Sequence, residues 1–267
     1  FIGMIMAIIA AIPLLYRAAR EPSKLYIVSL TIYAASLILL YAASTTYHTF
    51  DISVKVNTVL KKIDHMMISV LIAGSYTPVC LLVIGGRKGI TLLCIVWAFA
   101  IVGILIKAFW VFCPKWVSSI LYIGMGWTCV LAFSTILDNL SVAAFGWLLA
   151  GGIIYTVGGV IYALKLPIFN SKHKNFGSHE IFHLFVMGGS ICHFIVMYSC
   201  LTVCDLIKGH GSIGCIALRA CISVLYCITV LIHFRDREAE LSTLQVSAVQ
   251  HFLHCRCIGS CCCISIG

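Results

Sequence analysis

Long apolar blocks separated by short polar connectors organise this sequence. The blocks approach the roughly 20 residues that a helix needs to cross a bilayer core, and they predict spans at about 1–16, 26–48, 63–84, 90–112, 117–137, 142–164 and 180–203. The connectors carry turn or charged residues and are too short to hold a soluble domain. The pattern therefore predicts an all-α integral membrane protein, with a seven-transmembrane helix bundle over residues 1–204.

The two ends of the sequence depart from this pattern. The sequence begins at Phe1 inside an apolar run that lacks a basic stretch before it and a small-residue cleavage site after it, so we expect a truncated first span rather than a signal peptide. Residues 215–234 are apolar but include Arg219, and a charged, cysteine-rich stretch follows. We expect 205–267 to be an atypical extension, an eighth apolar segment plus a disordered tail, with a metal knuckle or acylated cysteines as alternatives.

Composition and charge agree with a membrane protein. Hydrophobic residues make up 61% of the chain and charged residues 10%, far from the balance of soluble domains. The net charge of +9 does not indicate nucleic-acid binding, because the basic residues lie in connectors between apolar blocks. When Lys107 near the fourth connector is included, the odd connectors carry five Lys and Arg residues and the even ones eight. This bias predicts a multi-pass cell-membrane protein with a cytoplasmic N-terminus and with the second, fourth and sixth connectors also in the cytoplasm.

Three polar clusters interrupt the apolar blocks. They are Ser44-Thr-Thr-Tyr-His48 at the end of the second span, Lys62-Ile-Asp64-His65 at the start of the third, and His179-Glu-Ile-Phe-His183 at the start of the seventh. Ionisable groups inside spans are costly and by default mark function. Because all three clusters adjoin even connectors, we expect them to meet at one depth near the cytoplasmic face.

The histidines of these clusters form a candidate metal site. His179 and His183 are four residues apart and share a helical face, and His48 supplies a third imidazole from another helix. Imidazole suits zinc, and three histidines with an open fourth position describe a catalytic zinc site. Asp64 is placed to accept a hydrogen bond from a water molecule there and to act as general base, while Ser44 shares a helical face with His48.

Each of these residues also has a structural interpretation. A single histidine at a helix end is often only an interfacial polar group. Asp64 can pair with Lys61 or Lys62, or favour the N-terminus of its helix, and Ser44 can bond back to its own helix. His193 lies ten residues beyond His183, about 15 Å along a helix. That distance makes it a poor ligand, and an interhelical hydrogen bond or a place on a cavity wall suits it better.

The clusters, in this order, resemble the hemolysin III branch of the progestin and adipoQ receptor family. The matching text also includes Ala73-Gly-Ser-Tyr-Thr-Pro78, Met125-Gly-Trp127 and Gly188-Gly-Ser-Ile-Cys-His193. The resemblance covers roughly residues 1–200 and implies a seven-helix protein with zinc near the cytoplasmic face. It places the ligands at His48, His179 and His183, with Asp64 and Ser44 around the bound water. The wider superfamily includes ceramidases, and the family name reflects cytolytic activity.

Three functions compete at this point. The first is a zinc-dependent hydrolase that cleaves an amide or ester of a membrane lipid, with Asp64 taking the proton. The second is a cytolytic pore, although the polar residues gather at one end instead of lining a path. The third is a receptor with structural zinc, which would be expected to use a fourth protein ligand.

Overall fold

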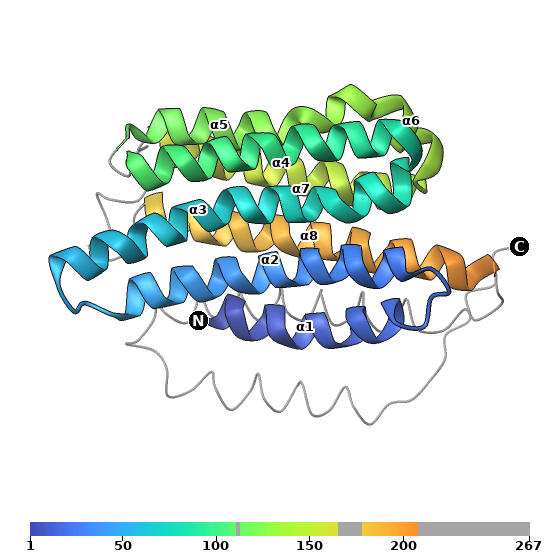
Figure 1. Cartoon of the computed structure of the whole chain (residues 1–267), viewed down its shortest axis with the longest axis horizontal. Helices are drawn as coiled ribbons and strands as arrows, with labels where there is room; N and C mark the ends of the chain where they lie inside the picture. Colours follow the sequence, from blue (N-terminus) through green and yellow to red (C-terminus); the bar gives the residue numbers. More distant parts are fainter. Residues whose placement is uncertain (111–112, 165–177, 208–267) are drawn as a thin grey trace, which may run out of the picture. The chain divides into compact units, whose positions relative to one another are not determined.

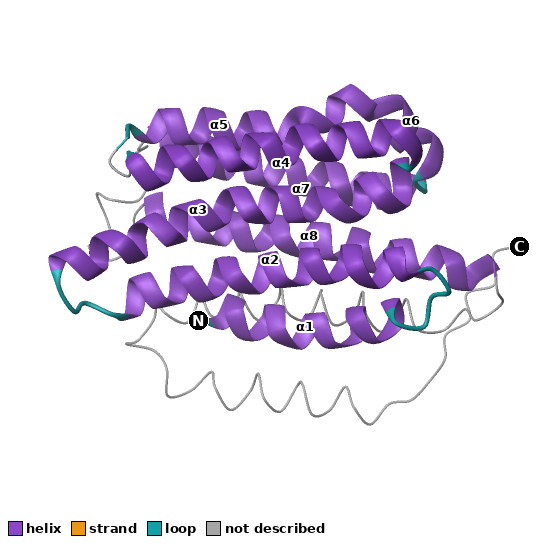
Figure 2. Cartoon of the chain, in the orientation of Figure 1, coloured by secondary structure: helices purple, strands orange, loops and turns teal. Residues whose placement is uncertain are grey.

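The computed structural model describes residues 1–110, 113–164 and 178–207, all within one unit, Phe1–Ala217. The predicted eighth apolar segment and tail therefore lie almost wholly outside the described residues. The described part is helical, with short loops and no strand (Figure 2). Its elements are α1 (Ile2–Ala18), α2 (Lys24–Thr49), α3 (Val54–Pro78), η1 (Val79–Ile84), α4 (Gly86–Phe109), α5 (Lys115–Trp127), η2 (Thr128–Ala132), α6 (Phe133–Asn139), α7 (Val142–Leu164) and α8 (Ser178–Ile207).

Within the described ranges, six helical stretches are long and apolar enough to cross a membrane. They run over Lys24–Thr49, Val54–Ile84, Gly86–Phe109, Trp116–Asn139, Val142–Leu164 and His179–Ser199. These match six of the seven predicted spans. The remaining one, α1, is an apolar helix of 17 residues, somewhat below the usual spanning length. The sequence thus predicted all seven helices, and the structure confirms six of them as candidate spans.

The outward faces of the helices are apolar, as expected for a protein that lipid surrounds. Large exposed side chains include Ile9 and Ile12 on α1, Leu131 on η2 and Val142 on α7. A water-soluble monomer rarely exposes apolar surface on this scale. The chain is therefore a multi-pass membrane protein; which of its ends faces the cytoplasm stays a prediction.

Local sequence signals explain where several helices begin and end. Ser23 and Ser53 cap α2 and α3, accepting hydrogen bonds from the backbone N–H groups of Leu25 and Val56, each at 3.3 Å. Gly85 and Gly86 form the turn before α4 with φ angles of 64° and 55°, a region that favours glycine. Consecutive apolar blocks can therefore reverse direction within very short connectors.

Two spans contain departures from regular α-helix. After Pro78, which lacks a backbone N–H, the third span continues as the wider helix η1. The fifth span passes through the tighter turns of η2, and the Tyr76 hydroxyl bridges this break. It donates to the Gly126 carbonyl at 2.6 Å and accepts from the Cys129 N–H at 2.8 Å. A neighbouring helix thus satisfies backbone groups that lipid cannot.

The helices pack in sequence order, with α1 on α2, α2 on α3, α3 on α4, and α7 on both α5 and α8 (Figure 1). Small residues allow the closest approaches between helices. A Cβ atom on Gly151 would lie 2.5 Å from the His193 ring, and one on Gly158 would lie 2.6 Å from Phe185 Cβ. The glycines of α7 thus let this helix pack closely against α8.

The contact between α2 and α3 gives a test of this packing. A Cβ on Gly74 would lie 2.1 Å from Ser36 Oγ and 2.6 Å from Ser36 Cβ, and the latter is fixed to the backbone. We expect Gly74→Ala to destabilise the bundle by about 1–3 kcal/mol, the usual cost of overpacking, measured as a lower thermal midpoint in detergent.

The matched control for this prediction is Gly124→Ala on α5, where a Cβ would meet no atom within 4 Å. There the change should be neutral or slightly stabilising, because alanine favours a helix over glycine. Equal midpoints for the two variants would contradict the packing described here.

Candidate metal site

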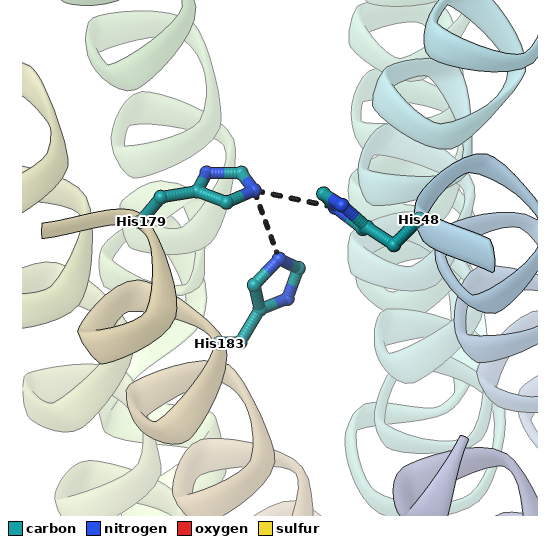
Figure 3. A group of neighbouring side chains, drawn as sticks. All are labelled: His48, His179 and His183. Atoms are coloured by element: carbon teal, nitrogen blue, oxygen red, sulfur yellow. Dashed lines mark hydrogen bonds between the residues drawn. The ribbon is translucent and has the colours of Figure 1, made fainter. Parts of the chain in front are cut away.

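Three histidines meet at one end of the bundle. His48 comes from the last turn of α2, and His179 and His183 come from the first two turns of α8 (Figure 3). The Nε2 atoms of His48 and His183 each lie 3.2 Å from Nε2 of His179. One ligand atom from each residue can be chosen so that all lie within 4.8 Å of one another. The predicted convergence of two distant segments is confirmed.

This arrangement fits a tetrahedral zinc ion. Ligands at the usual zinc–nitrogen distance lie about 3.3 Å apart around a tetrahedral centre, close to the two observed Nε2 separations. Neutral imidazoles carry one acceptor nitrogen each, and acceptors that face one another repel unless a cation or a proton lies between them. The histidine set can therefore hold a metal ion, although the geometry alone does not identify the metal.

The spacing of four residues explains how α8 presents two ligands. Residues i and i+4 lie one above the other on a helix, so His179 and His183 project toward the same point. Their ring centroids are 4.7 Å apart and nearly perpendicular. His48 meets both rings, with centroids 5.1 Å and 5.2 Å away. Among the described residues, no fourth His, Cys, Asp or Glu belongs to this group.

Asp64 and Ser44 lie on the wall of a cavity that also reaches His179 and His183. Asp64 is 6% exposed, and its carboxylate forms a hydrogen bond with the Ser44 side chain. The alternative pairing with Lys62 is not seen, since the Lys62 ammonium donates to the Ala108 carbonyl at 2.7 Å. The structure thus brings Asp64 and Ser44 together beside the histidines, while their predicted catalytic roles stay predictions.

His65 also lines the cavity, although it lies about 100° around the helix from Asp64. Its Nδ1 lies 2.8 Å from the Lys61 carbonyl oxygen and 3.5 Å from Asp64 Oδ2. The backbone contact holds the ring along α3, so His65 borders the carboxylate without joining the histidine cluster.

The cavity itself is the main feature that sequence reasoning missed. It encloses about 210 Å³ and follows α7 from Phe145 to Tyr162, a length of about 25 Å at 1.5 Å per residue. Most of its wall is apolar, with Ile68, Ile72 and Val186 between the polar groups of the histidine end and the more distant His193. Hydropathy carries no signal for such a cavity, because lipid-facing and cavity-facing positions are equally apolar.

A second missed feature is a buried ammonium group. The prediction of membrane orientation counted Lys107 with the fourth connector. In the structure, Lys107 lies in the last turn of α4 and is 3% exposed. Its Nζ lies 3.0 Å from Cys113 Sγ and also donates to Ser118 Oγ. It is therefore part of the bundle interior rather than a surface signal.

Together these features define a helical membrane protein with a three-histidine cluster at one end and an apolar cavity leading away from it. The chain belongs to the haemolysin-III-related family, whose model matches residues 1–194. The resemblance noted from the sequence motifs is confirmed.

Individual relatives agree with this assignment. The chain is 40% identical over 203 residues to a hemolysin-3 homolog of Bacillus subtilis (strain 168), covering 76% of this chain and 91% of that protein. It is 39% identical over 193 residues to the hemolysin-3 of Bacillus cereus, covering 72% and 84% respectively. A shorter match, 37% over 60 residues, links it to the adiponectin receptor protein of Drosophila melanogaster, covering 21% of this chain and 14% of the receptor.

Metal analysis tests the histidine cluster directly. We expect about one zinc ion per chain in detergent-purified protein, and loss of that metal in His183→Ala, because two remaining imidazoles bind zinc far more weakly than three. Elemental mass spectrometry on protein purified by size-exclusion chromatography measures the zinc content of the wild type and of the variant. His193→Phe is the matched control, since this histidine lies on the same helix about 15 Å away and should leave the metal in place. Metal retained in His183→Ala would contradict the site.

Proposed function

We propose that this protein is a zinc-dependent hydrolase that cleaves an amide or ester bond of a membrane lipid. The observation that supports this most strongly is the placement of Asp64. A buried carboxylate, held by Ser44, lies on the wall of an apolar cavity whose other polar lining includes two of the three clustered histidines. A metal site, a candidate base and room for a hydrocarbon chain occur together.

The cluster would supply the electrophilic part of the reaction. Zinc held by His48, His179 and His183 would polarise a carbonyl and lower the pKa of water. With three protein ligands in the group, a tetrahedral ion keeps a fourth position for a small molecule, as catalytic zinc sites do. A structural zinc site would be expected to use four protein ligands.

Asp64 would carry the proton. Its carboxylate accepts a proton from the attacking water and can return it to the leaving nitrogen or oxygen as the bond to the carbonyl carbon breaks. The hydrogen bond with Ser44 fixes the orientation of the carboxylate, and burial removes competing solvent. Both effects keep the base aligned with the reacting group.

The cavity would hold the hydrocarbon part of the substrate. Its wall is mainly apolar and it extends from the histidine end along α7, so an acyl chain can lie within the bundle while its carbonyl stays at the metal end. The substrate class that fits this shape is a lipid with one hydrolysable carbonyl at the end of a long chain.

The hemolysin-3 name of two relatives raises the pore as a second function. A water-filled path needs polar groups along its length. Here Asp64, His65 and the clustered histidines lie at one end, and the rest of the wall is mainly apolar, with scattered polar residues such as Ser75 and Thr156. Dye release from liposomes that contain the purified protein tests this alternative. Release that persists in Asp64→Asn, without lipid cleavage, would favour the pore over the hydrolase.

Removal of the base tests the hydrolase. Asp64→Asn should lower turnover of long-chain acyl amides or esters by about 10²–10⁴-fold, the usual contribution of general acid–base catalysis, while zinc content is unchanged. Release of fatty acid, measured by mass spectrometry, is the readout. Asp51→Asn is the control, because this exposed aspartate lies in the α2–α3 connector, where Asn57 donates to it. Equal turnover in both variants would refute the role of Asp64.

A second test blocks the cavity. Gly152 lies on the cavity wall in α7, and a Cβ there would meet no atom within 4 Å. Gly152→Phe should therefore fill the space and reduce turnover of long-chain substrates more than that of short-chain ones, with zinc retained.

Gly146→Phe is the control for the blocked cavity. Gly146 lies on the same helix with equally open space at its Cβ, but it is exposed and does not line the cavity. If Gly146→Phe and Gly152→Phe show the same ratio of long-chain to short-chain turnover, the cavity does not hold the acyl chain.

A further inference from the structure

The cavity has a second polar group, far from the histidine cluster. His193 on α8 lies on its wall, ten residues beyond His183 and so about 15 Å further along the helix. The wall between these positions includes Ile68, Ile72 and Val186. A molecule that fills the cavity therefore passes the polar histidine end, then a mainly apolar wall, and then the His193 imidazole with the Tyr155 ring beside it.

The nitrogens of this imidazole are not satisfied by the protein. Both Nδ1 and Nε2 of His193 are buried and have no hydrogen-bond partner among the described residues. A neutral imidazole offers one hydrogen-bond donor and one acceptor. When such a group is buried without a partner, no hydrogen bond offsets its desolvation free energy. In native proteins such groups usually pair with a ligand or an internal water.

Nearby hydroxyl groups are already engaged with one another. The Tyr155 ring lies beside His193, with centroids 5.3 Å apart, but its hydroxyl is 2.9 Å from Ser190 Oγ. The Tyr41 hydroxyl donates to the same Ser190 oxygen at 2.9 Å. These three side chains form a network that the imidazole does not join.

The close approach of α7 fixes the ring. A Cβ atom at Gly151 would lie 2.5 Å from His193 Cδ2 and 2.8 Å from Nε2, so the imidazole packs directly over the glycine. Such packing restricts the rotamers of His193 and preorganises its polar atoms. An oriented polar group on an apolar wall is the usual source of specificity in a small-molecule cavity.

We propose that His193 forms a second polar subsite, which recognises a hydroxyl group on the hydrocarbon part of the lipid bound in the cavity. A hydroxyl both donates and accepts, so it can pair with either nitrogen of a neutral imidazole in either tautomer. A charged group would be costly to bury there without a counter-ion. The subsite rests on the proposed function only in placing a lipid chain in the cavity.

The position of His193 sets which lipids it selects. With the carboxyl or carbonyl group at the histidine cluster, the hydroxyl must lie well along the chain, toward its middle or far end. A site that hydrogen-bonds a ligand hydroxyl discriminates against the analogue that lacks it, because its own buried group is then left unpaired. Saturated chains should therefore bind less tightly than correctly hydroxylated ones.

A binding experiment on the full-length, zinc-loaded protein in detergent tests this subsite without requiring turnover. The probes are octadecanoic acid and its isomers hydroxylated near the carboxyl, at mid-chain and near the far end, each competing with a fluorescent fatty acid. We expect one mid-chain or distal isomer to bind about tenfold more tightly than octadecanoic acid, as one net hydrogen bond provides. His193→Phe should abolish this preference, so that octadecanoic acid and its hydroxylated isomers bind equally, while the zinc content is unchanged.

The matched variant His193→Gln keeps a donor and an acceptor and should recover part of the preference. Equal binding of all the acids to the wild type, or a preference that persists in His193→Phe, would overturn the subsite even if lipid hydrolysis is found. Selective binding without hydrolysis would support the subsite and count against the hydrolase. If none of the acids binds, the cavity does not hold lipid, and both proposals fail.

Discussion

The lack of water in the bilayer core governs this structure, because each polar group that enters it must find its partner inside the bundle. The Tyr76 hydroxyl satisfies the backbone where the fifth span departs from α-helix. Tyr41 and Tyr155 both bond to Ser190 across three helices, and Lys107 lies against Cys113 and Ser118. Internal partners thus account for many of the polar side chains. Polar side chains that are not needed to satisfy another group in the bundle are candidates for function.

The histidine cluster illustrates how topology alone can build a site. Each crossing of the membrane reverses the chain, so the end of α2 and the starts of α3 and α8 lie at the same end of the bundle (Figure 1). Residues more than a hundred positions apart then need only share a depth and a helical face to meet. The close packing of glycines on α7 against α8 keeps this end aligned with the cavity, so the site and the apolar interior form one continuous space.

Hydropathy and spacing were sufficient to predict the spans and the three-histidine cluster. The length of each apolar block shows that it crosses the membrane, and counting the crossings shows on which side of the membrane each span end lies. Hydropathy and spacing were not sufficient for the extent of the cavity, for the partners of Lys107 or for the unpaired nitrogens of His193 among the described residues. Those features depend on how each helix is rotated about its axis. In lipid both faces of a helix are apolar, so a position on the outside, such as Leu131, and one on the cavity wall, such as Ile72, have the same sequence signal. Asp64, with its charge, and the three clustered histidines were recognisable as inward-facing beforehand.

The division of the metal ligands between α2 and α8 has a consequence for biosynthesis. A ribosome delivers His48 early, and it delivers His179 and His183 only after four further spanning stretches have been synthesised. The guanidinium of Arg17 on α1 lies over the Tyr198 ring of α8, 4.5 Å from its centroid. This cation–π contact between α1 and α8 can also form only after α8 has been synthesised. A chain that ends before α8 therefore lacks two of the three histidines, and the cluster is complete only when this last described helix is inserted.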